Sequence, residues 1–489
     1  MGDFPVWIRA THWINVLFIG FLIRAGIQIL GAYPRLYLND NCTPGTEWLK
    51  LTRKKIPMSG PWTALQQEED VTAWIAQPGG NNLGLGRHWH FFAATFWILN
   101  GVAYVILLFA TDQWRRLVPT SWGIFPGAWH TFVTYITLGQ PPASAFHPFD
   151  PLQQLSYFAV IFLLAPFLIL TAAAQSPAID ARFPWYPRLL GGRQKARSLH
   201  FLGLVAFVLF IVVHTFTVAY TGLGDNLGDI MLGQHANREG LAIGLAAGVI
   251  VVILAIYALT SWYSRRFPRR AQHALSRVIL PPMRSLSLSA RSRQQYTTSD
   301  ISPYFIVNGD PPATTEYTAL SREPNAFSEW RLEVRGLVER PLTLSLADLR
   351  AMPEETQITK HHCIQGWSGV ASWAGVNVQE IVSRCQPLRT ARYVIFTSYQ
   401  ADMAGRPFYE SIDVRLMSHP QTLLAYEMNG APLTVAHGAP LRLRVETELG
   451  FKMVKWLRAI EFVEDYRALG AGQGGSREDN MYYEQSVSI

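Results

Sequence analysis

Five long apolar stretches, all within the first 262 of 489 residues, limit the fold of this chain more than any other feature. A helix that crosses a bilayer needs about 20 mostly apolar residues and must satisfy its backbone polar groups internally. The predicted membrane spans are Trp13–Leu30, Phe91–Ala110, Leu155–Ala174, Leu199–Tyr220 and Leu241–Trp262. We therefore expect a multi-pass, all-α bundle of five transmembrane helices in the N-terminal half.

The composition agrees with a membrane protein and excludes two other classes. Charged residues make up 16% of the chain, against about 25% in a typical soluble domain. The net charge of +7 comes from residues beside the apolar stretches, with no nucleic-acid recognition motif, which excludes a nucleic-acid-binding protein. Three cysteines are too few for a disulfide framework or a four-cysteine metal site.

The second half of the chain has a different pattern. No comparable apolar stretch follows Arg265, and short alternating patterns typical of strands begin, among them Trp330–Gly336, Arg392–Tyr399 and Leu441–Val445. The dipeptide Asn429-Gly430 predicts a tight turn. We expect a transmembrane domain (1–264), a linker (265–300), a soluble, mainly β, α+β domain (301–467) and a flexible tail (468–489).

Basic residues near the ends of the predicted helices are divided unevenly between the two sides of the membrane. Twelve lie on the side of the C-terminal domain and four on the side of the N-terminus. Cytoplasmic loops carry the excess of Lys and Arg. We therefore expect a multi-pass protein of the inner (cell) membrane with its C-terminal domain in the cytoplasm, in keeping with the lack of a visible twin-arginine export signal.

Four histidines near the ends of the predicted spans are candidate haem ligands, because ionisable groups within spans are costly and usually functional. His200 and His214 share one helix, about 21 Å apart along its axis and within about 40° of the same face. Since successive helices alternate in direction, His12 meets His214 near one membrane surface, and His90 (or His88) meets His200 near the other. Each pair suits bis-histidine ligation of a haem iron. Without a C-x-x-C-H motif, both haems would be non-covalent haem b.

This half of the chain resembles the cytochrome b subunits of nickel–iron hydrogenases and formate dehydrogenases, over about residues 5–262. The resemblance rests on Arg9-x-x-His12-Trp13, on Trp89-His90-Phe91 with Asn100-Gly101, and on His200-x13-His214 followed by Thr221-Gly222. It implies that His90 rather than His88 is the ligand, and that electrons are exchanged with membrane quinone. Arg24, inside the first span, could pair with a haem propionate, extend toward the membrane surface or pair with a polar neighbour.

One cysteine of the soluble domain stands out. Cys363 follows two histidines in the run His361-His362-Cys363-Ile364-Gln365-Gly366-Trp367-Ser368. Such a cysteine could be a nucleophile, a metal ligand or a buried apolar residue, and the local sequence leaves these three possibilities open. Cys385 has no such neighbours and is expected to be buried.

Three motifs follow Cys363 in order: Asn429-Gly430-Ala431-Pro432, His437-Gly438-Ala439-Pro440-Leu441-Arg442 and Gly450-Phe451-Lys452-Met453-Val454-Lys455. Together with Cys363 they are similar to the molybdopterin domain of the sulfite oxidase family, which includes the bacterial methionine sulfoxide reductase catalytic subunit. The resemblance covers about residues 301–467. It implies a molybdenum–molybdopterin cofactor with Cys363 as the thiolate ligand of the metal at the catalytic centre, a role that suits a soft sulfur donor.

The same resemblance implies a site for the phosphate-bearing pterin. Arg442 and Lys455 would supply its positive charge. The other expected contacts are His437, Met453, Val454, Asn308 and Ser398. The strand pattern alone would instead place Arg442 on a solvated face, where Arg444 is expected.

Two departures from the family concern the substrate. Gln365-Gly366-Trp367-Ser368 replaces the Gly-Asn-Arg type run of sulfite oxidases, which argues against sulfite. His437, in contrast, agrees with sulfite oxidases and replaces the asparagine of methionine sulfoxide reductases. The substrate pocket therefore matches neither branch completely.

The whole sequence predicts a membrane-bound, molybdopterin-dependent oxidoreductase. Two haem b groups would pass electrons between quinone and a molybdenum site that transfers an oxygen atom, with reduction of a small-molecule substrate favoured. One alternative is a dehydrogenase that oxidises a sulfur compound and reduces quinone. The other is a dihaem electron conduit whose soluble domain is a non-catalytic docking module.

Overall fold

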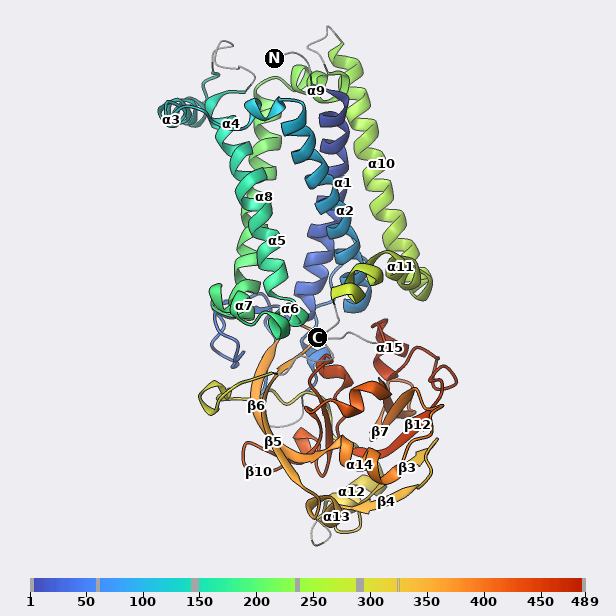
Figure 1. Cartoon of the computed structure of the whole chain (residues 1–489). Coiled ribbons are helices and arrows are strands. Elements are labelled where there is room, and N and C mark those ends of the chain that lie inside the picture. Colours follow the sequence, from blue (N-terminus) through green and yellow to red (C-terminus); the bar gives the residue numbers. More distant parts are fainter. Residues whose placement is uncertain are drawn as a thin grey trace.

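The computed structural model describes residues 4–58, 62–141, 149–233, 238–286, 294–322, 324 and 326–485. A helical domain (residues 4–286) and a β domain (residues 294–485) are stacked end to end (Figure 1). The N-terminus lies at the end of the bundle far from the β domain, and the C-terminus lies where the two domains meet.

Within the described residues, five helical segments are long and apolar enough to cross a membrane, which confirms the predicted number of spans. They are α1 (Val6–Ala32), α2 (Leu83–Ala110), the segment Pro151–Ala174, α8 (Arg193–Tyr220) and α10 (Glu239–Arg266). The third segment consists of α4 (Pro151–Phe158), a π-helical stretch (Ala159–Leu164) and α5 (Ala165–Ala174). Pro166, at the start of α5, has no N–H to donate, and the wider π-helical turns before it are consistent with that missing hydrogen bond.

Shorter helices connect the spans. These are α3 (Ile124–Ile136), α6 (Pro177–Arg182), α7 (Trp185–Leu189) and α9 (Leu223–Leu232). The long loop between α1 and α2 contains a short hairpin of β1 (Arg35–Leu36) and β2 (Leu49–Lys50) and a 3-10 turn at Ala64–Gln67. This loop extends from the bundle toward the β domain.

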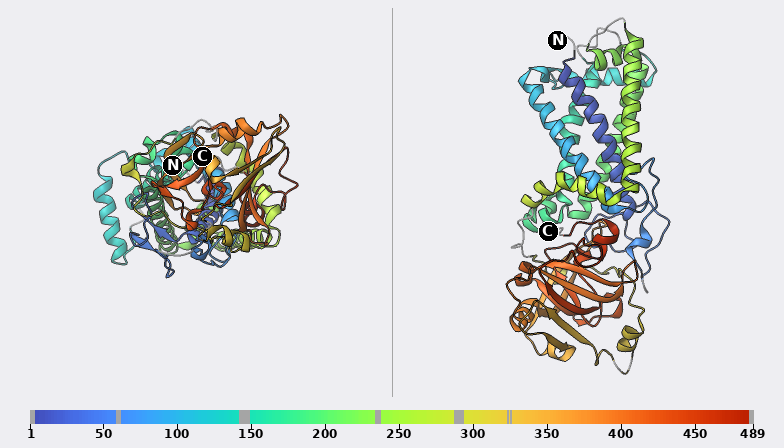
Figure 2. Two further views of the ribbon diagram at one scale, coloured as in Figure 1. Left: turned by 90° about the horizontal axis from the view of Figure 1, so that it is seen from below. Right: turned by 90° about the vertical axis from the view of Figure 1, so that its right-hand side faces the viewer.

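The expected linker contains a helix, α11 (Pro268–Leu286), which lies across the end of the bundle and packs on α2 and α10 (Figures 1 and 2). Ala271, Leu275 and Ile279 are buried at four-residue spacing, whereas His273 and Arg277 are exposed. Residues four apart share one face of a helix. The segment that follows the last span is therefore an amphipathic part of the helical domain.

The β domain contains two five-stranded sheets, as expected for a mainly β fold. In the first, the order is β10-β9-β6-β5 with β11 paired to β9; in the second, it is β4-β3-β12-β7-β8. The first sheet comprises β5 (Glu354–His362), β6 (Ser368–Asn377), β9 (Thr422–Met428), β10 (Ala431–Pro432) and β11 (Arg442–Val445). The second comprises β3 (Arg331–Gly336), β4 (Leu342–Ser345), β7 (Tyr393–Ala401), β8 (Pro407–Asp413) and β12 (Leu457–Val463). The predicted Asn429-Gly430 turn joins β9 to β10, with φ angles of 53° and 77°.

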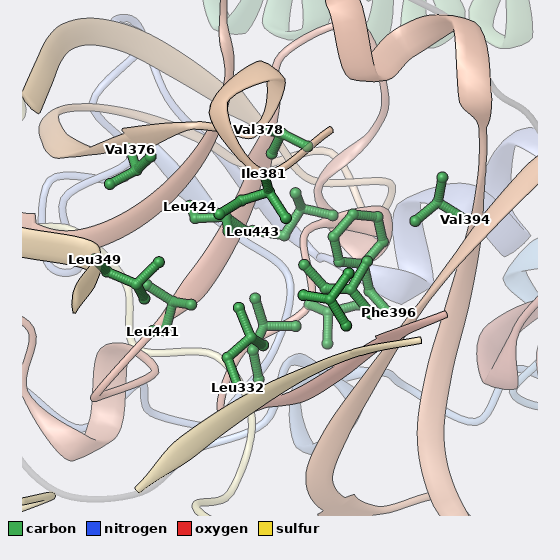
Figure 3. Packing of buried hydrophobic residues seen from close by; sticks show 14 of the residues in the cluster. Leu332, Leu349, Val376, Val378, Ile381, Val394, Phe396, Leu424, Leu441 and Leu443 are labelled. Atoms are coloured by element: carbon green, nitrogen blue, oxygen red, sulfur yellow. The ribbon is translucent and has the colours of Figure 1, made fainter. Parts of the chain in front are cut away.

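The core of the β domain is built from both sheets (Figure 3). Val376 and Leu443 of the first sheet pack in one cluster with Val394 and Phe396 of the second. Cys385 belongs to this cluster, as expected. Three helices complete the domain: α12 (Thr315–Ser321), α13 (Leu346–Arg350) and α14 (Val378–Cys385).

The C-terminal segment differs from the expected flexible tail. Residues 468–485 are packed at the domain boundary and include α15 (Ser476–Met481) (Figure 1). The carboxylate of Glu478 is fully buried and pairs with Lys452, whose Nζ also lies 3.0 Å from Glu410. The polar composition of this segment predicts exposure to solvent. In the structure, its polar side chains instead pair with residues inside the protein that are distant in sequence.

Candidate functional site

A cavity of about 110 Å³ lies between the β domain and the helical domain. Its lining includes all but one of the cofactor residues expected in the β domain: Cys363, Asn308, His437, Arg442, Met453, Val454 and Lys455. Ser398 is the exception, and its hydroxyl donates to the Lys455 carbonyl (2.7 Å) beside the cavity. The residues that the sequence motifs predicted therefore lie around one cavity in the structure.

Cys363 lies in a tight turn between β5 and β6. Its amide donates to the Trp367 carbonyl (3.0 Å), and the Gly366 amide donates to the Cys363 carbonyl (3.1 Å). Gly366 has a φ of 115°, which residues with a side chain rarely adopt. The cysteine is 5% exposed, and burial raises the pKa of its thiol to about 12. A nearby metal cation would favour the thiolate form, so the position fits a metal ligand.

Arg442 and Lys455 line the cavity without an ion pair to any carboxylate of the described residues. Arg442 is buried; its Nη1 donates to the His437 carbonyl (2.9 Å), whereas its Nε has no hydrogen-bond partner. Lys455 Nζ donates to the Ala436 carbonyl (2.9 Å). Burial, and then the charge of a neighbouring arginine, lowers the pKa of both groups well below the usual range. Two desolvated cations with spare donors fit an anionic group such as a phosphate.

Two histidines lie in the same wall. Burial, followed by the charges of Arg442 and Lys455, lowers the pKa of His437 to about 4, so its imidazole is neutral near pH 7. His361, which the sequence analysis did not select, accepts a hydrogen bond at Nδ1 from Arg444 Nη1 (3.2 Å). The position of His361 two residues before Cys363, in the run His361-His362-Cys363, was the available signal for it.

Arg444 does not lie on a solvated face, contrary to the expectation. It is fully buried, donates from Nε to Glu446 Oε1 (2.7 Å) and lies over the Trp373 ring at 4.3 Å. The alternation along β11 correctly separated two faces, but both are covered. Alternation cannot reveal a covering residue, such as Trp373, that comes from elsewhere in the chain.

The four histidines expected to bind haem lie as two pairs in the bundle. The rings of His12 on α1 and His214 on α8 face each other, with centroids 6.5 Å apart. His90, near the start of α2, is within electrostatic reach of His200, near the start of α8. Both helices begin at the β-domain end of the bundle (Figure 1). A Cβ at Gly26 of α1 would lie 3.7 Å from the His90 ring, so a residue without a side chain faces it.

Hydrogen bonds orient two of these imidazoles. His200 Nδ1 donates to the Leu168 carbonyl (3.1 Å); because a carbonyl only accepts, Nε2 keeps its lone pair for a metal. His214 Nδ1 lies 3.4 Å from the Tyr157 hydroxyl. His88, in contrast, is engaged at both nitrogens, with Gly84 (2.7 Å) and Glu484 (2.8 Å). The contacts therefore agree with the choice of His90.

Arg24 has polar neighbours. Its Nη2 donates to the carbonyls of Ala73 (2.6 Å) and Ala76 (3.1 Å) and to the hydroxyl of Ser261 (2.9 Å). These contacts anchor the α1–α2 loop to the bundle. Of the possibilities for Arg24, these contacts support pairing with a polar neighbour.

The turn that holds Cys363 is bonded directly to the helical domain. Gln194 Nε2, at the start of α8, donates to the Gly366 carbonyl (2.7 Å) and the Ser368 hydroxyl (3.1 Å). Glu68 of the α1–α2 loop accepts from Gln365 Nε2 (2.9 Å). His200 follows Gln194 by six residues, about 9 Å along the helix axis. A short path through α8 therefore connects the His90–His200 pair with the Cys363 turn.

Comparison with known families separates the chain into the same two parts. Residues 3–234 match the model of prokaryotic cytochrome b561, and residues 320–468 match that of the oxidoreductase molybdopterin binding domain. These families imply haem b in the helical domain and a molybdenum cofactor in the β domain. The structure supports that fit through the facing histidines, the buried thiol and the unpaired cations.

Individual relatives match parts of the chain. The putative protein-methionine-sulfoxide reductase subunit YedZ1 of Azospira oryzae is 36% identical over 161 residues, 33% of this chain and 56% of that protein. The protein-methionine-sulfoxide reductase catalytic subunit MsrP of Xanthomonas campestris is 33% identical over 203 residues, 38% of this chain and 62% of that protein. The chain thus spans less than two thirds of the length of these relatives.

Among solved structures, the sulfane dehydrogenase SoxCD from Paracoccus pantotrophus is 23% identical, covers 28% of this chain and 39% of that chain, and has a TM-score of 0.26. The two family matches account for most of the described residues of both domains. The chain therefore joins a membrane domain of the prokaryotic cytochrome b561 family to an oxidoreductase domain of the molybdopterin-binding family.

Proposed function

We propose that this chain is a membrane-bound molybdenum oxidoreductase that contains its own electron carrier. Two haem b groups, one held by His12 and His214 and one by His90 and His200, pass electrons between membrane quinone and a molybdopterin site at Cys363. One observation carries the proposal: the turn that holds Cys363 is hydrogen-bonded to the first turn of the helix that bears His200 and His214.

The residues around the cavity divide the work of holding the cofactor. Cys363 would ligate the molybdenum, and Arg442 and Lys455 would bind the pterin phosphate, with His437, Asn308 and the backbone of Met453 and Val454 beside them. Ser398 would act indirectly, by holding the Lys455 carbonyl. When bound, the cofactor supplies the two-electron chemistry of oxygen-atom transfer. A haem held by two histidines would carry single electrons.

We favour the reductive direction. Quinol would supply two electrons through the haems, and the substrate would lose one oxygen atom, which leaves as water with two protons. The names of the relatives, protein-methionine-sulfoxide reductases, point the same way. We also propose that the protein lies in the inner (cell) membrane with the β domain in the cytoplasm; the excess of Lys and Arg near the helix ends on the β-domain side supports this orientation.

The deciding measurement is the metal content of full-length protein purified from a host that makes the cofactor. We expect one molybdenum and two iron atoms per chain, and quinol oxidation that depends on an added oxide. Cys363→Ser should abolish turnover and keep both haems. Full turnover in that variant would overturn the molybdenum site. Turnover only with a reduced sulfur compound and quinone would reverse the direction, and two irons without molybdenum would leave a dihaem conduit.

A further inference from the structure

A guanidinium from the C-terminal segment lines the same cavity as Cys363. Arg477, on α15, lies outside residues 320–468 that match the molybdopterin-binding family, and its side chain lines the cavity beside Met481 and Tyr483. Its charge acts on the Cys363 thiol and on the Glu68 carboxyl. The positive charge of Arg477 is therefore placed close to the expected metal ligand.

This guanidinium forms no ion pair with a carboxylate of the described residues. Its Nη1 donates to the sulfur of Met481 (3.3 Å), a weak acceptor, and the group lies 5.7 Å from the Phe408 ring. The nearby acid, Glu68, instead accepts from Gln365 Nε2 (2.9 Å). Burial raises the pKa of Glu68, which favours its neutral form. Most of the five donors of Arg477 are thus available to a ligand in the cavity.

The segment around Arg477 is fixed to both domains. The Arg477 amide donates to Glu410 Oε1 (3.3 Å), and the next residue, Glu478, pairs with buried Lys452. On the other side, Arg269 Nη2 of α11 donates to the carbonyls of Glu478 and Asp479 (2.9 Å each). An arginine on a fixed backbone loses less conformational freedom when it binds a ligand.

The helical domain forms part of the cavity wall. Thr63, Ala64 and Leu65 of the α1–α2 loop form part of its lining. Ile364, next to Cys363, packs in one cluster with Ala32 and Leu83 of the bundle and with Tyr483. Residues of both domains therefore narrow the space around Cys363.

We propose that Arg477 binds the negative charge of a small, anionic oxide next to Cys363, as a specificity-determining residue. This inference rests on the proposed function. In the reaction one bond between the central atom and oxygen breaks, two electrons come from quinol through the haems, and the oxygen leaves as water with two protons. Substrate and product both keep their negative charge, so the same guanidinium holds each of them. The planar fork of arginine suits two oxygens of such an anion.

The test uses the full-length holoenzyme and sulfate as the probe. Arg477→Gln and Arg477→Lys are compared with wild type and with Arg467→Gln, a matched control, because Arg467 is exposed and pairs with Asp465 on the surface (2.8 Å). By titration calorimetry, we expect Arg477→Gln to weaken sulfate binding at least tenfold and Arg477→Lys to retain part of the affinity. Arg467→Gln should bind as wild type does, and molybdenum content should be the same in all four proteins.

Turnover provides the second readout. Arg477→Gln should lower kcat/KM at least tenfold for anionic oxides. For dimethyl sulfoxide, kcat/KM should stay within twofold of the wild-type value. Unchanged sulfate affinity in this variant would overturn the proposal, as would a wild-type preference for neutral oxides or for methionine sulfoxide in a folded protein. Loss of molybdenum in Arg477→Gln would assign this residue to the cofactor instead. Turnover and sulfate binding test different claims. If the proposed function is wrong, the wild-type protein will reduce no oxide at all. The sulfate affinity of Arg477→Gln tests the role of Arg477 in either case.

Discussion

Buried cations of the β domain fall into two groups that serve different purposes. Arg444 pairs with Glu446, and Lys452 pairs with Glu410 and Glu478, so their charges are compensated inside the protein. Arg442 and Lys455 line the cavity and form no ion pair with the described residues. Because removing a charge from water without a partner is costly, the second group destabilises the cofactor-free fold and would be compensated when an anion binds.

Replacing one unpaired cation should therefore separate binding from stability. We expect Lys455→Met to lower molybdenum content by at least half, and to stabilise the cofactor-free protein by about 1–4 kcal/mol. Lys50→Met, which removes an exposed lysine, should change neither quantity. Metal analysis and thermal unfolding of the three proteins provide the comparison, and a cofactor-free Lys455→Met that melts below wild type would contradict the argument.

The same lysine predicts a pH dependence. Burial and then Arg442 lower the pKa of Lys455 well below its usual range, so the unfolded chain binds more protons than the folded chain below about pH 10.4. Stability of the cofactor-free protein should therefore rise with pH, from the folded-state pKa up to that value. The rise should be smaller in Lys455→Met, because the variant has no group to titrate there.

At the scale of helices, periodicity explains what could be predicted and what could not. The 3.6-residue period put His200 and His214 on one face of a helix, and in the structure α8 brings His214 opposite His12. No such signal existed for α15, because its burial depends on Lys452 and Arg269, which are distant in sequence. Arg477 was missed for the same reason.

The α8 histidines lead to a prediction about haem stoichiometry. We expect His200→Ala and His214→Ala each to reduce haem b from two to one per chain, since a haem with one strong ligand is lost on purification. His130→Ala, on the exposed side of α3, and His88→Ala, whose ring pairs with Glu484, should keep both haems. Haem quantification by the pyridine method measures the outcome; two low-spin haems in His200→Ala would disprove the pairing.

The arrangement of the whole molecule depends on how the β domain is fixed to the bundle. Lys360 of β5 lies 2.5 Å from Asp40 in the α1–α2 loop and 3.0 Å from Asp180 on α6. Asp40 also accepts from the Gln194 amide at the start of α8 (2.8 Å). This buried group therefore connects the strand before Cys363, the loop and the helix that bears His200. The family motifs predicted both domains, but this contact between them depends on Lys360, Asp40, Asp180 and Gln194, which no motif includes.

Breaking this group should slow electron transfer between the cofactors and leave the cofactors in place. Lys360→Met leaves Asp180 buried and Asp40 half-buried without their cation. Removing one partner of a buried ion pair typically costs about 3–5 kcal/mol. Burial opposes ionisation, but the charge of Lys360 lowers the pKa of Asp40, and those of Asp40 and Asp180 raise the pKa of Lys360. The contribution to docking is thus present from about pH 5 to pH 10, lost in acid as Asp40 protonates and in base as Lys360 deprotonates.

Hydrogen exchange and pre-steady-state kinetics at pH 7 measure the effect of Lys360→Met. We expect faster exchange in the Cys363–Ser368 turn and slower haem oxidation by substrate, with unchanged iron content. Arg335→Met removes an exposed ion pair to Glu333 (2.9 Å), worth about 0–1 kcal/mol, and should behave as wild type. If Lys360→Met kept wild-type exchange and kinetics, this ion-pair group would not hold the domains together. The other contacts between them, from Gln194 and Glu68 to the Cys363 turn and from Arg269 to the C-terminal segment, would have to do so.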